Sequence, residues 1–129
     1  MGHGDDVGKG IKSSTEIDAD RLADEARGSE HGEAYQQMGG LNGIGVGVGA
    51  REASRGEPEY FIEFLIPVCS GSEVDLDRLA WTLEVLKGLE EMGYSLTCQD
   101  DMTFSCEITT RGDKLEGEYD RAISLLARS

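Results

Sequence analysis

The sequence predicts an α+β fold in which an N-terminal helix precedes the order β-β-α-β-β-α. Alternating apolar residues over 44–49 and an almost fully apolar segment over 60–66 indicate two strands. An apolar pattern with the period of a helix follows over 75–92, and a second strand pair and a second helical pattern complete the chain. The simplest packing of these elements is a mainly antiparallel four-stranded sheet with two helices packed on one face.

The N-terminal part of the chain differs in composition from the rest. Twelve of the 18 glycines lie within residues 1–49, and large apolar side chains are sparse there. Residues 1–13 show no periodicity and are expected to form a flexible tail. Residues 14–40 are expected to form an N-terminal helical segment, and residues 41–129 the α+β domain.

The two strands before the long helix differ in their expected burial. Ile44, Val46 and Val48 alternate with glycines, which predicts a strand with one apolar face and one bare face. The segment 60–66 is apolar on both faces except at Glu63, which predicts a central strand.

The segment 75–92 carries the strongest helical pattern of the chain. Ser72 or Asp75 is expected to cap its N-terminus, and Gly93 is expected to follow its C-terminus at the C′ position. Its apolar side chains cover an arc of about 200°, roughly twice the width that one sheet face needs. The helix is therefore expected to contact a second partner besides the sheet.

The C-terminal part predicts strands over 94–98 and 102–109, followed by a helix that begins at Asp113. A three-residue loop between the strands places Leu96 opposite Phe104 and keeps the apolar side chains of both strands on one face. The last strand is expected to lie between the first strand of this hairpin and the central strand, which then run parallel to each other.

The charge of the chain limits its partners. The 26 acidic residues outnumber the 12 basic ones, which gives a formal net charge of −14 at pH 7. A surface with this much negative charge repels the phosphate backbone of nucleic acids and the headgroups of anionic lipids. Neither nucleic acid nor a membrane is therefore an expected partner. The N-terminus lacks the basic start and apolar stretch of a signal peptide, and a cytoplasmic location is expected. A single Asn and three Gln are compatible with a thermophilic source.

Cysteine and histidine usage predicts neither a metal site nor a cofactor. Cys69, Cys98 and Cys106 are widely spaced and form no CxxC motif, so free thiols are expected. The two histidines, His3 and His31, lie in polar, glycine-containing segments, and no Cys/His cluster has the spacing of a structural zinc site.

Three charged residues are candidates for a ligand-binding site. Arg51 and Arg55 lie in the expected loop over 51–58, where they could grip a carboxylate or a phosphate. Glu63 lies within an apolar strand, a position that suits a general acid or base. These residues support an alternative function as a small-molecule or metal-binding module or an enzyme.

Apolar side chains left over by a sheet with two helices predict an interface. If the side of the long helix that carries Leu76, Leu83 and Leu86 covers the sheet, the helix exposes another set of apolar side chains: Trp81, Val85 and Met92. Phe61 and Leu65 likewise need a cover on the far face of the sheet. The preferred expectation is therefore a non-enzymatic protein-interaction or regulatory module that acts as a homodimer.

The order of elements together with the acidic charge resembles the type III secretion chaperones. Members of that group are acidic dimers that hold extended segments of partner proteins. The resemblance implies a role in protein binding and covers element order and charge, without shared motifs.

Overall fold

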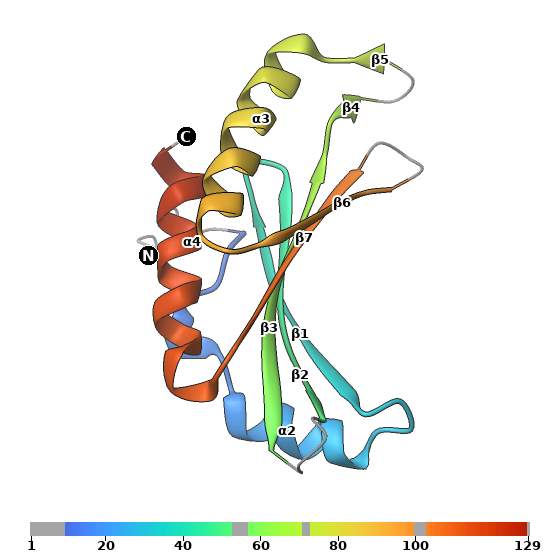
Figure 1. Cartoon of the computed structure of the whole chain (residues 1–129), viewed down its shortest axis with the longest axis vertical. Coiled ribbons are helices and arrows are strands. Elements are labelled where there is room, and N and C mark those ends of the chain that lie inside the picture. Colours follow the sequence, from blue (N-terminus) through green and yellow to red (C-terminus); the bar gives the residue numbers. More distant parts are fainter. Residues whose placement is uncertain (1–9, 53–56, 71–72, 100–102, 129) are drawn as a thin grey trace.

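The computed structural model describes residues 10–52, 57–70, 73–99 and 103–128 and has the predicted α+β class. Its main sheet has five antiparallel strands in the order β1-β2-β3-β7-β6 (Figure 1). These strands are β1 (Glu33–Leu41), β2 (Ile44–Glu52), β3 (Pro58–Pro67), β6 (Ser95–Cys98) and β7 (Thr103–Thr110). A separate pair consists of β4 (Cys69–Ser70) and β5 (Glu73–Val74). The helices are α2 (Ala19–Gly28), α3 (Leu76–Glu91) and α4 (Leu115–Arg128), with the 3-10 turns η1 (Ser14–Glu16) and η2 (Gly112–Lys114).

The prediction of a four-stranded sheet is wrong because it missed β1. This strand pairs with β2 over its whole length. Its sequence contains polar residues and glycines where a strand normally shows apolar alternation, and the register shifts between Gln37 and Gly39. Ala34 and Met38 are still buried. Pairing with β2 therefore determines this strand more than its local pattern does.

The helix in the N-terminal segment is shorter than expected. The helix α2 begins after Asp18, whose side chain accepts a hydrogen bond from the Arg21 amide at 3.2 Å. Residues 10–13, expected to belong to the tail, lie against the sheet. The Lys12 amide donates to the Met38 carbonyl at 2.8 Å, and the Lys12 carbonyl accepts from Tyr119 Oη at 2.7 Å. The tail prediction is corrected for these four residues, and residues 1–9 lie outside the described part.

The order of the strands after β1 agrees with the sequence. The strand β3 occupies the centre of the sheet, between β2 and β7. The last strand, β7, lies between β3 and β6, so β3 and β6 run parallel as predicted. The eight-residue loop expected after residue 50 is shorter, because β2 continues to Glu52 and β3 already begins at Pro58.

The hydrophobic core lies between one face of the sheet and the helices. The three α-helices of the described residues lie on this side, with α2 near one end of the sheet and α3 and α4 next to each other (Figure 1). From the sheet, the core receives the even-numbered residues of β2 and β3, such as Val48 and Ile62. From the helices it receives Leu22, Leu89 and Leu126, all fully buried. The odd-numbered residues of β2 and β3 point to the opposite face, which we call the open face.

The ends of α3 are as predicted, but its orientation is not. The Asp75 side chain caps the N-terminus by accepting from the Arg78 amide at 3.0 Å, and Gly93 follows the helix with φ +101°. Val85 is fully buried, however, whereas Leu83 is 50% exposed and does not cover the sheet. An apolar arc of about 200° offers two sides for burial, and packing against α4 and the sheet decides between them.

The C-terminal hairpin keeps the predicted faces in a different register. Leu96 lies opposite Cys106, and Cys98 lies opposite Phe104. The register therefore differs by two residues from the predicted one, and a shift of two leaves every side chain on the same face. Cys106 is fully buried, as the prediction requires, but Cys98 at the strand end is exposed. The last helix begins at Leu115 and not at Asp113, because Asp113 belongs to the 3-10 turn η2 that precedes it.

Candidate functional site on the open face of the sheet

Arg51 lies on the strand β2, not in a loop, and its guanidinium is already paired. Its Nε atom lies 3.3 Å from Glu33 Oε2 on β1. Its two terminal nitrogens each donate to Glu107 Oε2 at 3.2 Å, across β3 on the strand β7. The Arg51 side chain is 27% exposed. An anionic ligand would have to displace two carboxylates from Arg51, which argues against the expected grip on a carboxylate or phosphate.

Glu63 lies on the same face as Arg51, on the central strand. It is opposite Gly47 on one side and opposite Glu107 on the other. Its Oε1 atom accepts a hydrogen bond from Tyr35 Oη at 3.2 Å. Burial, the charge of Glu63 and this hydrogen bond raise the pKa of Tyr35 from its ordinary 10.0 to about 12. Glu63 thus orients a neutral tyrosine on the surface of the sheet.

Two aromatic rings lie over the glycines of β2. Tyr35 and Phe61 stack with their ring centroids 6.3 Å apart. A Cβ atom on Gly47 would overlap the Tyr35 ring, and one on Gly49 would overlap the Phe61 ring. The alternating glycines of β2 therefore provide the space in which the two rings lie against the backbone. The Arg51 guanidinium covers Phe61 at 4.3 Å from the ring centroid, which leaves Phe61 only 5% exposed.

A hollow of about 560 Å³ lies beside Glu107. Glu107 and four hydroxyl-bearing residues of β6 and β7 line much of it: Ser95, Thr97, Ser105 and Thr109. By alternation from Glu107, the residues of β7 in this set lie on the open face. Its lining offers one carboxylate and several hydroxyl oxygens, a set that accepts hydrogen bonds from N–H donors.

The sequence predicted only part of this face. It singled out Arg51, Glu63 and Phe61, which the structure brings together, but not Tyr35 or Glu107. The signal for Glu107 was its place one residue after an apolar position of the last strand, which puts it on the opposite face. Tyr35 gave no comparable signal because it belongs to the strand that was missed. Arg55 lies outside the described residues.

The residues expected at an interface lie in different environments. Leu65 is 37% exposed on the open face. Trp81 and Met92 pack against the core and are only partly buried, and Arg78 covers Trp81 at 4.4 Å from the ring centroid. Val85 is fully buried and has no surface to offer a partner in this fold.

Comparison of the chain with protein-family models, with curated proteins and with solved structures gives no match. None of these comparisons supports the resemblance to the type III secretion chaperones, which rested on the predicted order of elements and on the charge. Within the described residues, no three His, Cys, Asp or Glu side chains are grouped so that they could hold a metal ion. No helix in this part of the chain is both long and apolar enough to cross a membrane.

Proposed function

We propose that this protein is a non-enzymatic protein-interaction module that acts as a homodimer, paired through the outer face of α3. One observation carries the proposal. Leu76 and Leu83 are 74% and 50% exposed, and they lie seven residues apart on one side of the helix, with the exposed Ala80 between them. Two leucines in this spacing form a stripe that a second helix can cover.

The position of α3 supports this pairing. Its N-terminal half extends beyond the end of the five-stranded sheet, beside β4 and β5 (Figure 1). In an antiparallel pairing of two copies, Leu76 of one copy lies opposite Leu83 of the other, and Ala80 allows close approach at the centre. The same register brings Lys87 towards the N-terminal end of α3 in the second copy, but also brings Glu84 near its Asp75.

Light scattering at low and high salt tests the proposal. Because each copy carries a net charge of −14, added salt should strengthen association. The variant Leu83→Gln should weaken association by about tenfold or more. Leu83 is lost from both copies, and because it is already half-buried in the monomer, each copy loses about 0.7–1.5 kcal/mol of burial. The matched variant Leu65→Gln, on the open face, should leave association unchanged.

Two other outcomes would contradict the proposal. A wild-type protein that stays at 14.0 kDa at high concentration in both buffers would contradict the homodimer. Dissociation by Leu65→Gln without an effect of Leu83→Gln would instead place the contact on the open face.

A further inference from the structure

The open face of the sheet has no helix of the described part against it, and its charge is strongly one-sided. Among the described residues, four glutamates point to this face from β1, β3 and β7, against the single guanidinium of Arg51. They are Glu33, Glu59, Glu63 and Glu107. Two of them, Glu63 and Glu107, lie directly opposite each other on neighbouring strands. Like charges in that arrangement repel, so a cation placed between them stabilises the face.

Within the described residues, this repulsion is relieved only in part. Among the described residues, Arg51 bonds to one oxygen of Glu107, Oε2, and to none of Glu63. The Oε1 atom of Glu63 receives the Tyr35 hydroxyl, a neutral donor. One oxygen on each carboxylate thus keeps its capacity to accept from a cation.

The aromatic rings add a second feature that favours cations. The Arg51 guanidinium stacks on the Phe61 ring while its nitrogens contact the carboxylates of Glu33 and Glu107. This face thus already holds one guanidinium between an aromatic ring and carboxylates. Tyr35 is 42% exposed, and its hydroxyl lies beside Glu63. A basic side chain from outside would find an aromatic ring and an adjacent carboxylate there, in the same combination.

The hollow beside Glu107 extends these features to the other edge of the sheet. Its serine and threonine hydroxyls can accept from ammonium or guanidinium groups that also reach Glu107. From β1 to β6 the face is about 19 Å wide, given a spacing of about 4.8 Å between neighbouring strands. The face is therefore wider than a single amine group needs, and it has room for several basic side chains of one polypeptide.

We propose that the open face binds a segment of a partner protein that carries several arginine or lysine side chains. The inference rests on the proposed role in protein binding and names the chemistry of the partner. A second copy of this chain is disfavoured on this face, because two faces rich in glutamate would meet. Self-association through α3 leaves the open face available.

Fluorescence anisotropy with a labelled probe peptide tests the proposal. The probe is an eight-residue peptide of alternating arginine and threonine, which places all arginines on one side of an extended chain. The full-length protein should bind it saturably, and binding should weaken with salt. The same peptide with glutamate in place of arginine should not bind.

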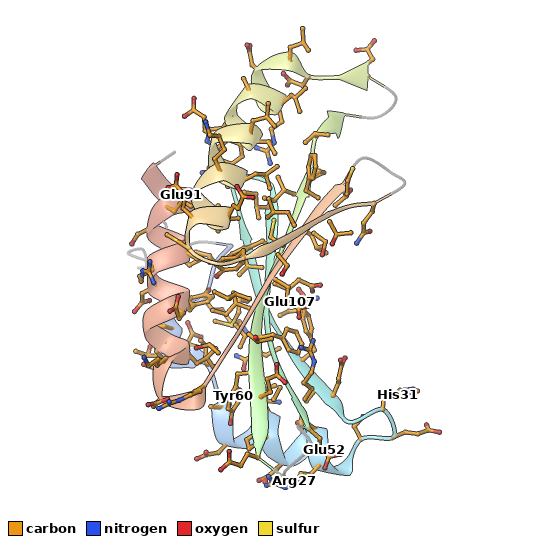
Figure 2. The ribbon with its side chains drawn as sticks, in the orientation of Figure 1. Arg27, His31, Glu52, Tyr60, Glu91 and Glu107 are labelled. Atoms are coloured by element: carbon orange, nitrogen blue, oxygen red, sulfur yellow. The ribbon has the colours of Figure 1, made fainter. Side chains whose placement is uncertain are left out.

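The variant pair Glu63→Gln/Glu107→Gln should weaken binding of the probe by about tenfold. The matched pair Glu90→Gln/Glu91→Gln removes the same charge from exposed positions of α3 and should change affinity less than twofold. Figure 2 shows Glu91 on the helical side of the molecule. Glu63→Gln alone keeps an oxygen for the Tyr35 hydroxyl and should still weaken binding about threefold. This single variant decides the question if loss of the Glu107–Arg51 contact disturbs folding.

Three results would overturn the proposal: no saturable binding of the probe, an equal loss of affinity in both variant pairs, or equally tight binding of spermine. The second would assign the binding to net charge alone, and the third to a small polyamine. Light scattering on the same variants separates this inference from the proposed function, because Glu63→Gln/Glu107→Gln should still form dimers. Loss of peptide binding in a protein that still dimerises concerns the open face only.

Discussion

At the residue scale, the two described thiols differ although they lie on one face of one hairpin. Cys106 is fully buried under the helices, and burial raises the pKa of its thiol from 9.0 to about 12. Cys98 is exposed at the end of β6. A thiol reacts as the thiolate, and its sulfur must be accessible to the reagent. Burial keeps Cys106 protonated and also shields its sulfur, so it slows the reaction of Cys106 in two ways.

We predict that the Cys69→Ser protein presents one fast thiol and one slow thiol to a disulfide reagent such as DTNB at pH 8. Cys98 should react in the native protein, and Cys106 should react roughly 100-fold more slowly or only after unfolding. Adding Cys98→Ser should abolish the fast phase. A fast phase that survives this second substitution would mean that the region around Cys106 opens readily.

At the element scale, two glycines of the strand β2 lie where a larger residue does not fit, whereas a third does not. A Cβ atom on Gly49 would overlap the Phe61 ring and come within 2.6 Å of the Ala34 backbone oxygen. A Cβ atom on Gly45, on the same face of the same strand, would meet only Leu65 Cβ, at 3.9 Å. The space above Gly45 is ordinary, whereas the space above Gly49 is occupied by backbone as well as by a ring.

We predict that Gly49→Ala lowers the free energy of unfolding by about 2 kcal/mol, since backbone must move to relieve the overlap. Gly45→Ala should leave it unchanged or raise it by about 0.5 kcal/mol, because alanine loses less entropy than glycine in a strand. Urea-induced unfolding followed by circular dichroism measures both. Equal effects of the two substitutions would show that the glycines matter only through backbone entropy.

The sequence predicted elements with a strong local signal and missed those that depend on pairing. The apolar run of β3 and the Asp75 and Gly93 ends of α3 are local features, and these predictions were confirmed. The strand β1 has no such pattern, because it is held by its pairing with β2. For the same reason the open face was recovered only in part. Arg51 and Glu107 are 56 residues apart and meet only through the order of the strands.

At the scale of the whole molecule, the fold separates three surfaces. All described α-helices bury one face of the sheet, while the other face keeps its glutamates, its two aromatic rings and a hollow. The outer side of α3 is a third surface, apolar and distant from these carboxylates in the fold. A homodimer through α3 and a basic partner on the sheet therefore do not compete, and each can be tested without the other.

Alkaline pH should destabilise the whole molecule through its buried tyrosines. Burial, followed by the charge of Glu118, raises the pKa of Tyr94 well above its ordinary 10.0. The unfolded chain ionises near pH 10 while the folded protein holds this hydroxyl neutral. Unfolding therefore releases a proton above pH 10. The free energy of unfolding is unaffected by this group below pH 10. It then falls by about 1.4 kcal/mol per pH unit for each such tyrosine, as the pH rises towards the pKa of the tyrosine in the folded protein.

We predict that Tyr94→Phe makes this alkaline loss smaller by about 1 kcal/mol at pH 11, measured by urea unfolding at pH 8 and pH 11. At pH 8 the variant should be at least as stable as the wild type, because the Tyr94 hydroxyl has no hydrogen-bond partner among the described residues. The comparison variant is Tyr119→Phe, which loses the bond from Tyr119 Oη to the Lys12 carbonyl and should cost about 1 kcal/mol already at pH 8. If Tyr94→Phe instead destabilised the protein at pH 8 as much as Tyr119→Phe does, the Tyr94 hydroxyl would have a hydrogen-bond partner in solution.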